Sequence, residues 1–192
     1  MLREGTAKRS SKEIAEQVDS LGASLGATAS LASFTSTVTA SGLVENLDQL
    51  LDIFSDVVRN PKFPADEVEK FKSRTLAGLQ FLRSNPTYLA QERFNRAIYG
   101  NHPAALVTPP TESLRRTTAA DLAQFHSTYY RPNNAMLTIV GDVKLKEVLP
   151  KIERAFGDWQ KGDSCQANFE FDSQQRRRHP ACHLVVQFII CK

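Results

Sequence analysis

The sequence predicts an α+β fold on two observations. Residues 23–29 and 33–41 are rich in small and β-branched residues, which favour strands. Most of the segments that follow carry apolar residues three or four positions apart, which is typical of amphipathic helices. An early strand pair followed by helices, with further strands near the end, fits an α+β or a mixed α/β domain. With 192 residues, the chain can bury roughly 70% of its unfolded surface without a disulfide framework.

The first helix is expected at residues 11–21. Ser10 and Glu13 have the spacing of a capping box, in which each side chain bonds the backbone N–H of the other residue. Apolar residues then recur every three or four positions until Gly22, a residue type that commonly ends helices. In residues 33–41, apolar and small residues alternate with threonine and serine. This alternation predicts a strand next to the first one.

Three apolar-periodic segments then predict three helices. The first covers residues 47–58 and ends at Asn60-Pro61, because the residue before proline is disfavoured in a helix. The second begins after Pro64, with acidic residues near its positive end, and is broken by Asn85-Pro86. A shorter third helix runs to the loop at residues 100–110, which contains three prolines and no periodicity. This loop is the best internal boundary.

The rest of the chain adds two helices and three strands. Thr118 and Asp121 resemble a capping box and predict the start of a helix. The apolar run at residues 136–140 reads as a buried strand. A final amphipathic helix covers residues 145–156, and Pro150 should kink it or shift its start. The last two strands are expected at residues 168–171 and 183–191.

Charge and hydropathy exclude several classes of protein. The net charge is +3, which equals the contribution of Arg176, Arg177 and Arg178 alone, so a broad basic face for nucleic acid is absent. No stretch approaches 18 consecutive apolar residues, so we expect no membrane span. The first thirty residues contain no apolar core of a signal peptide. We expect a soluble chain whose compartment the sequence does not reveal.

The histidines form no helix-borne metal pair. His102 lies in a loop and is expected to be structural rather than catalytic, while His126 is expected to be a partly exposed surface residue. Cysteine and histidine, the soft metal ligands, cluster only in the tail. A terminal strand with incidental cysteines is favoured there over a metal site. The cluster consists of His179, Cys182, His183 and Cys191. Neither a glycine-rich phosphate loop nor a Gly-x-Ser-x-Gly nucleophile elbow occurs. Spacing alone therefore predicts no self-contained active site.

Several short sequence motifs, by their order and spacing, resemble those of the M16 peptidases. This is the zinc metallopeptidase family of pitrilysin, insulinase and mitochondrial processing peptidase. The resemblance covers roughly residues 1–160. It implies an M16 domain of the LuxS and mitochondrial-processing-peptidase type, here incomplete, with a mixed, largely antiparallel sheet packed by helices. The motifs are MLREGT at residues 1–6, NPKFP at 60–64, YGNHP at 99–103, YYRPNNA at 129–135 and IVGDV at 139–143.

The resemblance implies zinc chemistry that this chain lacks. In the family, the two histidines of a His-x-x-Glu-His helix bind zinc, and the glutamate of this motif activates a water molecule. A downstream glutamate is the third zinc ligand. That helix motif precedes the segment matched by Met1, so the chain begins one residue too late to contain it. The downstream ligand falls at Ala77 or Gly78, where no acid is present. We therefore expect no catalytic residue and no metal ligand in this chain. Zn²⁺ is expected in the family or in an active partner of this chain.

The resemblance also implies a peptide-binding edge. Family members add substrate as a strand to an exposed sheet edge, and the matching residues are Leu25, Gly26, Ala27 and Thr28. Asparagine is common in the family where this chain has Gly26. The alternative is an internal strand whose small residues pack under helices. The expected partners are peptides and either a catalytic M16 subunit or the other half of the same protein. We do not expect the chain to bind nucleic acid or to span a membrane.

The resemblance leaves three functional hypotheses. We expect residues 1–110 to be the C-terminal part of an M16 N-terminal-type segment and residues 111–192 the start of a C-terminal-type segment, together in one structural domain. The favoured hypothesis is a non-catalytic subunit or inactive half of a peptidase. The alternatives are a fragment of an active zinc endopeptidase whose motif lies upstream of Met1, and a structural core subunit. The tail departs from the family pattern, and we expect an exposed apolar sheet edge at residues 184–190.

Overall fold

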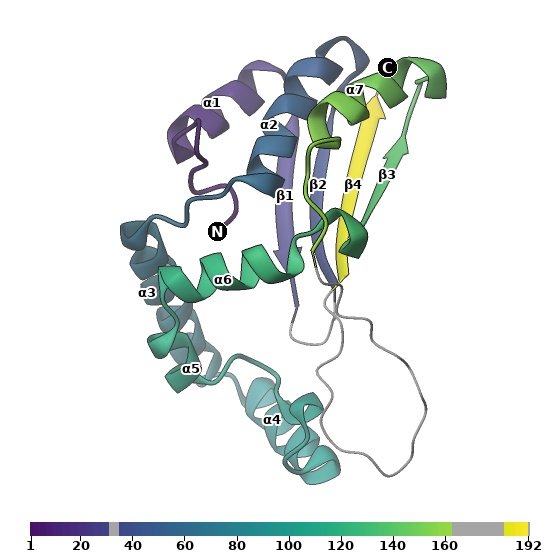
Figure 1. The fold of residues 1–192 in the computed structure, drawn as a ribbon. Coiled ribbons are helices and arrows are strands. Elements are labelled where there is room, and N and C mark those ends of the chain that lie inside the picture. Colours follow the sequence, from purple (N-terminus) through teal and green to yellow (C-terminus); the bar gives the residue numbers. More distant parts are fainter. Residues whose placement is uncertain (31–34, 163–182, 192) are drawn as a thin grey trace.

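The computed structural model describes residues 1–30 and 35–162 and the backbone of residues 183–191. The strand expected at residues 168–171 lies outside this range, as do the side chains of the tail cluster at His179, Cys182, His183 and Cys191. An early strand pair is followed by a run of helices and then by further strands, as predicted (Figure 1). The elements are α1 (Ser11–Ser20), β1 (Ser24–Ala29), β2 (Thr35–Leu43), α2 (Leu47–Arg59), α3 (Ala65–Leu82), α4 (Pro86–Tyr99), α5 (Thr111–Arg116), α6 (Ala119–Tyr129), β3 (Ala135–Val140), α7 (Leu145–Phe156) and β4 (His183–Cys191).

Both predicted capping boxes are present. Ser10 accepts from the backbone of Glu13, whose side chain accepts from Ser10, and Thr118 and Asp121 do the same at the start of α6. These bonds satisfy N–H groups that the first turn of a helix leaves unpaired. Pro150 lies inside α7, so it does not shift the start of that helix.

The described strands form one mixed sheet in the order β1-β2-β4-β3. β1 pairs with β2 antiparallel, whereas β4 pairs parallel with both β2 and β3. The α+β class and the mixed sheet are as predicted, but antiparallel pairing is confined to β1 and β2 and is less extensive than expected. The predicted apolar edge at residues 184–190 is wrong, because β4 lies between two neighbours and its backbone groups are paired on both sides.

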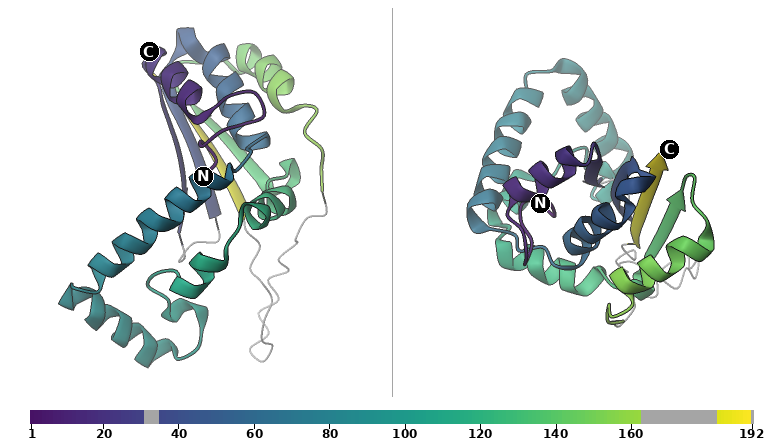
Figure 2. Two further views of the ribbon diagram at one scale, coloured as in Figure 1. Left: turned by 90° about the vertical axis from the view of Figure 1, so that its left-hand side faces the viewer. Right: turned by 90° about the horizontal axis from the view of Figure 1, so that it is seen from above.

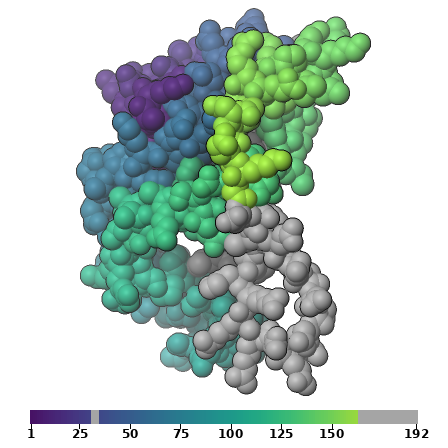
Figure 3. Space-filling model, in the orientation of Figure 1, coloured from purple at the N-terminus to yellow at the C-terminus, as the bar shows by residue number. Residues whose placement is uncertain are grey.

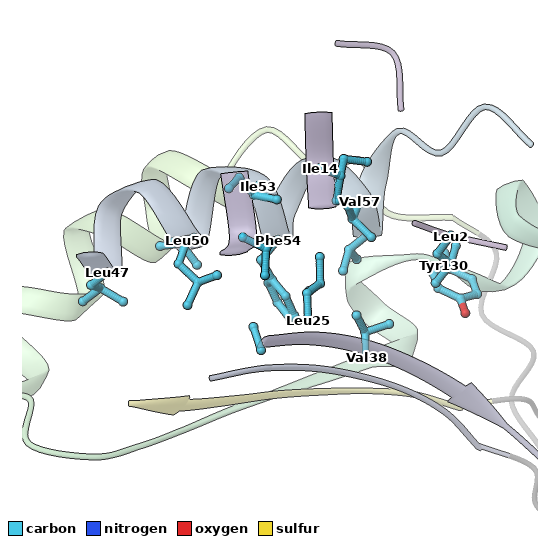
Figure 4. Packing of buried hydrophobic residues seen from close by; sticks show 14 of the residues in the cluster. Leu2, Ile14, Leu25, Val38, Leu47, Leu50, Ile53, Phe54, Val57 and Tyr130 are labelled. Atoms are coloured by element: carbon cyan, nitrogen blue, oxygen red, sulfur yellow. The ribbon is translucent and has the colours of Figure 1, made fainter. Parts of the chain in front are cut away.

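The core forms where α2 packs onto the sheet. Leu50, Phe54 and Val57 of α2 are almost completely buried and point toward the sheet, where Val38 of β2 is also fully buried (Figure 4). Helices α1 and α7 lie on the same side of the sheet as α2 (Figure 1). Leu137 and Ile139 of β3 also pack against this core. Burial of this apolar surface is the main favourable term that holds the helices on the sheet.

A buried carboxylate attaches the first ten residues to α2. Asp56 Oδ2 accepts from Thr6 Oγ1 at 2.6 Å and from Arg9 Nη1 at 2.8 Å, while Asp56 Oδ1 accepts from Asn60 Nδ2 at 3.1 Å. Arg9 also forms an ion pair with Asp52. Asp56 and Thr6 are each only 2% exposed, so these bonds satisfy groups that water cannot reach. The N-terminal segment is therefore a fixed part of the fold.

Helices α3 and α4 project from this body as an arm (Figure 2). In the space-filling view, the teal arm extends below the body (Figure 3). Val68 is the one buried residue of α3, and none of the α4 residues is buried. Phe81 and Phe94 are 77% and 60% exposed. The arm thus contributes little to the core.

Replacing Phe54 with alanine should lower the free energy of unfolding by about 3–5 kcal/mol, because the fully buried ring leaves a cavity beneath α2. Phe81→Ala is the matched control, and its effect should stay within about 0.5 kcal/mol because Phe81 is on the exposed arm. Urea unfolding followed by circular dichroism measures both. Equal losses for the two variants would contradict this assignment of the core.

Candidate functional site

β1 is an edge strand of the described sheet. The order β1-β2-β4-β3 gives it a single strand neighbour, so one row of its backbone groups points away from the sheet. Among the described strands, β1 therefore lies at the edge of the sheet rather than inside it. The segment matched to the family's peptide-binding residues, Leu25 to Thr28, lies within β1.

Two contacts reveal which β1 residues direct their backbone groups outward. Arg3 Nη1 donates to the Leu25 carbonyl at 2.5 Å, and the Ala23 N–H donates to the Val18 carbonyl of α1 at 3.1 Å. Alternate residues of an antiparallel strand direct both backbone groups toward the partner strand, and the residues between them direct theirs away. Since Ala23 and Leu25 bond away from β2, Ala27 and Ala29 also present their backbone groups outward. Arg3 already occupies part of this edge.

Two hollows lie beside β1. The first, which we call the polar hollow, has a volume of about 390 Å³. Its polar lining residues are Arg3, Glu4, Ser11, Asp19 and Ser24. The second, which we call the aromatic hollow, has a volume of about 490 Å³ and adjoins Ala27, Thr28 and Ala29. Its large apolar lining residues are Met1, Leu2, Phe63, Phe71, Leu122, Phe125 and Tyr130. The two ends of one edge strand therefore meet surfaces of different chemistry.

His126 lines the aromatic hollow and packs against aromatic neighbours. Its Nε2–H donates to the Val58 carbonyl at 2.7 Å, and its ring stacks on Tyr130 with centroids 4.6 Å apart. Phe63 contacts the ring from another side. Burial lowers the pKa of His126, and nearby Arg131 acts in the same direction, while the bond to Val58 opposes them. The side chain is partly exposed, as expected, and it also packs against Tyr130 and Phe63.

His102 is a structural residue of its loop, as expected. Its Nδ1 accepts the backbone N–H of Ala104 at 3.2 Å and caps the short 3₁₀ turn Pro103–Ala105. A neutral ring nitrogen is needed for this acceptor role. The contact gives histidine a structural role at this position.

The family's zinc does not fit the residues that the structure describes. Ala77 and Gly78, where the resemblance led us to expect the downstream ligand, are exposed on α3, and a Cβ added at Gly78 would meet no atom within 4 Å. Within residues 1–30 and 35–162, no three His, Cys, Asp or Glu side chains are grouped as metal ligands require. We therefore derive no metal-dependent step for this part of the chain.

Comparison with known proteins agrees with the fold. Residues 1–111 match the model of the insulinase family, peptidase family M16. The chain belongs to peptidase family M16. Residues 116–187 match the family model described as the peptidase M16 inactive domain. In the described part of this M16 chain, no helix is both long enough and apolar enough to cross a membrane.

Relatives of this M16 chain are much longer than it is. An uncharacterized zinc protease of Rickettsia bellii is 29% identical over 171 residues, which cover 88% of this chain and 40% of the relative. The mitochondrial-processing peptidase subunit beta of Caenorhabditis elegans is 25% identical over 165 residues, covering 85% of this chain and 36% of the subunit. The chain thus spans about two fifths of the curated relatives it matches.

Solved structures show the same architecture. The peptidase M16 inactive domain from Pseudomonas fluorescens superposes with a TM-score of 0.69 at 28% identity, covering 84% of this chain and 40% of that one. The first half of the periplasmic protease PqqL from Escherichia coli superposes with a TM-score of 0.68 at 21% identity, covering 94% of this chain and 38% of that one, which supports the fold alone.

The family resemblance left an edge strand and an internal strand as open alternatives for residues 25–28, and it did not predict the residues that surround this strand. Arg3 is one charged residue among several near the start of the chain, and its contact with Leu25 spans 22 positions. Phe71 and Phe125 read as ordinary members of apolar stripes. These two side chains are 42% and 40% exposed, and this incomplete burial is what marks them as possible binding residues. The exposure depends on how α3 and α6 pack near β1, so the sequence alone could not reveal it.

The lowered pKa of His126 predicts that acid destabilises the chain. An unfolded histidine titrates near pH 6.5, and the folded ring resists protonation below that value because it is buried. The unfolded state therefore binds more protons as the pH falls below about 6.5, so stability decreases in this direction. Urea midpoints at pH 7.5 and pH 5.5 measure the effect.

His126→Gln is the control for this pH dependence, because glutamine keeps an N–H donor but does not titrate. Its urea midpoint should fall less than that of the unmodified chain over the same pH interval. Equal decreases would show that His126 does not contribute to the acid sensitivity.

Proposed function

We propose that this chain is a non-catalytic module of an M16 peptidase that binds extended peptides along β1. The open backbone edge at Ala27 and Ala29 carries the proposal. The absence of an acid at Ala77 and Gly78 supports a binding role over a catalytic one. The match of residues 116–187 to the inactive-domain model is consistent with this role.

Backbone pairing suits a protein that handles varied peptides. A peptide added to a sheet edge forms its hydrogen bonds with main-chain groups, so binding requires no fixed sequence. Gly26, where family members often have asparagine, does not obstruct this edge. Its backbone groups point toward β2, and a Cβ there would lie 3.0 Å from Thr39 Oγ1 on the neighbouring strand. Glycine at this position accommodates Thr39 and leaves the outward groups of Ala27 unchanged.

A second M16 half or subunit is the proposed partner. The chain spans about two fifths of relatives such as the Rickettsia bellii protein, so those relatives contain a further M16-sized portion. The sheet face opposite the core exposes Met136 and Val140 of β3, which are 65% and 55% exposed. Large apolar surfaces of this kind favour contact with another protein. Together the two halves would enclose the peptide.

We also propose that residues 1–110 and 111–192 build one structural domain. β1 and β2 come from the first segment, whereas β3 and β4 come from the second, and all four share one sheet. The segment boundary in the sequence then lies in a connecting loop rather than between two separately folded units.

A zinc endopeptidase is the second candidate function. Its support is the description of several relatives, including those of Rickettsia bellii and Bacillus subtilis, as uncharacterized zinc proteases. This function would require a His-x-x-Glu-His motif upstream of Met1 and a further ligand in place of Ala77 or Gly78. The non-catalytic role needs neither.

The residues upstream of Met1 would separate the two candidates, because a His-x-x-Glu-His motif there would favour the enzyme. Zinc stoichiometry tests whether residues 1–192 by themselves hold a metal. The chain is loaded with zinc at neutral pH, dialysed and analysed for metal content. The non-catalytic role predicts no retained zinc. One zinc per chain would contradict it, and a variant truncated after Arg178 would then test whether His179, Cys182, His183 and Cys191 hold the metal.

Replacing Ala27 with proline should weaken peptide binding by about tenfold or more, because it removes an outward N–H while leaving the ladder to β2 intact. Ala27→Ser keeps this N–H and is the matched control. Fluorescence anisotropy with a labelled unstructured peptide measures affinity, and circular dichroism verifies that each variant is folded. Equal affinities for the two variants would contradict binding at this edge.

A further inference from the structure

The register of β1 determines where a bound peptide would place its side chains. Residues directly opposite each other on neighbouring strands point to the same face of a sheet. Leu25 and Ala27 both face the helices, because Leu25 is a member of the buried core and Ala27 packs against it. A peptide residue opposite Ala27 would therefore direct its side chain toward the helices, where the aromatic hollow lies.

The aromatic hollow has the size and chemistry to hold one large apolar side chain. Phe71 of α3 and Phe125 of α6 line it and remain 42% and 40% exposed, so each has apolar surface left to bury. Aromatic rings pack well against one another edge to face, which adds to the gain from removing apolar surface from water. An aromatic or large aliphatic side chain fits this environment better than a small or charged one.

Arg3 provides a different recognition element two residues along the same edge. Its Nη1 donates to the Leu25 carbonyl, and it forms no ion pair with any carboxylate in the described part of the chain. The neighbouring acid, Glu4, accepts from Ser11 instead. A guanidinium has five N–H donors and suits bidentate contact with a carboxylate, so Arg3 has donors left for one.

Arg3 also prevents ordinary strand pairing from continuing past Leu25. Because the Leu25 carbonyl already accepts from Arg3, a peptide strand opposite this residue would have to displace the guanidinium to use that carbonyl. A chain that ends there in a carboxylate would instead gain a charged partner. In a strand antiparallel to β1, the residue opposite Leu25 comes two positions after the residue opposite Ala27, at a distance of roughly 7 Å.

We propose that this edge selects an extended peptide with a bulky apolar side chain opposite Ala27 and a carboxylate two residues later at Arg3. The peptide runs antiparallel to β1. This selectivity rests on the proposed binding of peptides along β1 and adds a substrate class to it. Arg3 is then a residue that determines specificity, and the aromatic hollow is the site for one side chain.

The test compares three fluorescein-labelled peptides on the full chain by anisotropy. The first is Ala-Thr-Phe-Thr-Ala with a free carboxyl terminus, the second has alanine in place of phenylalanine, and the third ends in an amide. Loss of the phenyl ring should weaken binding by about tenfold or more, since the ring would no longer remove apolar surface from water. The amide should bind about threefold more weakly, as expected for an exposed ion pair.

Two variants connect these preferences to residues. Arg3→Ala should remove the difference between the acid and the amide, whereas Lys8→Ala, which changes another exposed cation of the same segment, should keep it. Phe71→Ala should reduce the preference for phenylalanine, and Phe81→Ala on the same helix should not. The readout is a ratio of affinities between peptides, so a general loss of stability would not imitate it.

The outcomes separate this inference from the function on which it rests. Peptides that bind without preference for phenylalanine or for the free carboxylate would overturn the inference and leave edge binding intact. Failure of all three peptides to bind would overturn both. A preference that persists in Arg3→Ala and Phe71→Ala would place the selective contacts elsewhere and would also overturn the inference.

Discussion

The buried carboxylate of Asp56 holds the part of the chain on which the candidate site depends. It accepts from Thr6, Arg9 and Asn60 and thereby fixes the first ten residues against α2. Removing one partner of a buried charged pair typically costs about 3–5 kcal/mol, because the other charge is left buried without compensation. With the segment fixed, Arg3 reaches the Leu25 carbonyl, so a guanidinium lies beside the start of β1.

A second constraint is the position of β4 inside the sheet. The last described strand pairs with β2 on one side and β3 on the other, so the centre of the sheet is completed by residues from the far end of the chain. This arrangement leaves β1 at the edge, with its outward backbone groups next to two hollows of different polarity. The shape of the candidate site therefore follows from long-range strand pairing together with the anchored N-terminal segment.

The sequence predicted what depends on neighbouring residues and missed what depends on distant ones. Both capping boxes, the helices other than α5 and the strands at β1, β2 and β3 follow from local spacing. The place of β4 could not be predicted, because an apolar strand reads the same at an edge and at the centre. Similarly, the packing of His126 under Tyr130 and the contact of Arg3 with Leu25 join residues that only the folded chain brings together.

Amide hydrogen exchange in β1, measured with and without a bound peptide, tests the central claim most directly. The account predicts that Ala27 and Ala29 exchange faster than Gly26 and Thr28 in the free chain, since only the latter two bond to β2. Peptide binding should then slow Ala27 and Ala29. Protection of all four amides in the free chain, or slowing by peptide only outside β1, would contradict an open peptide-binding edge.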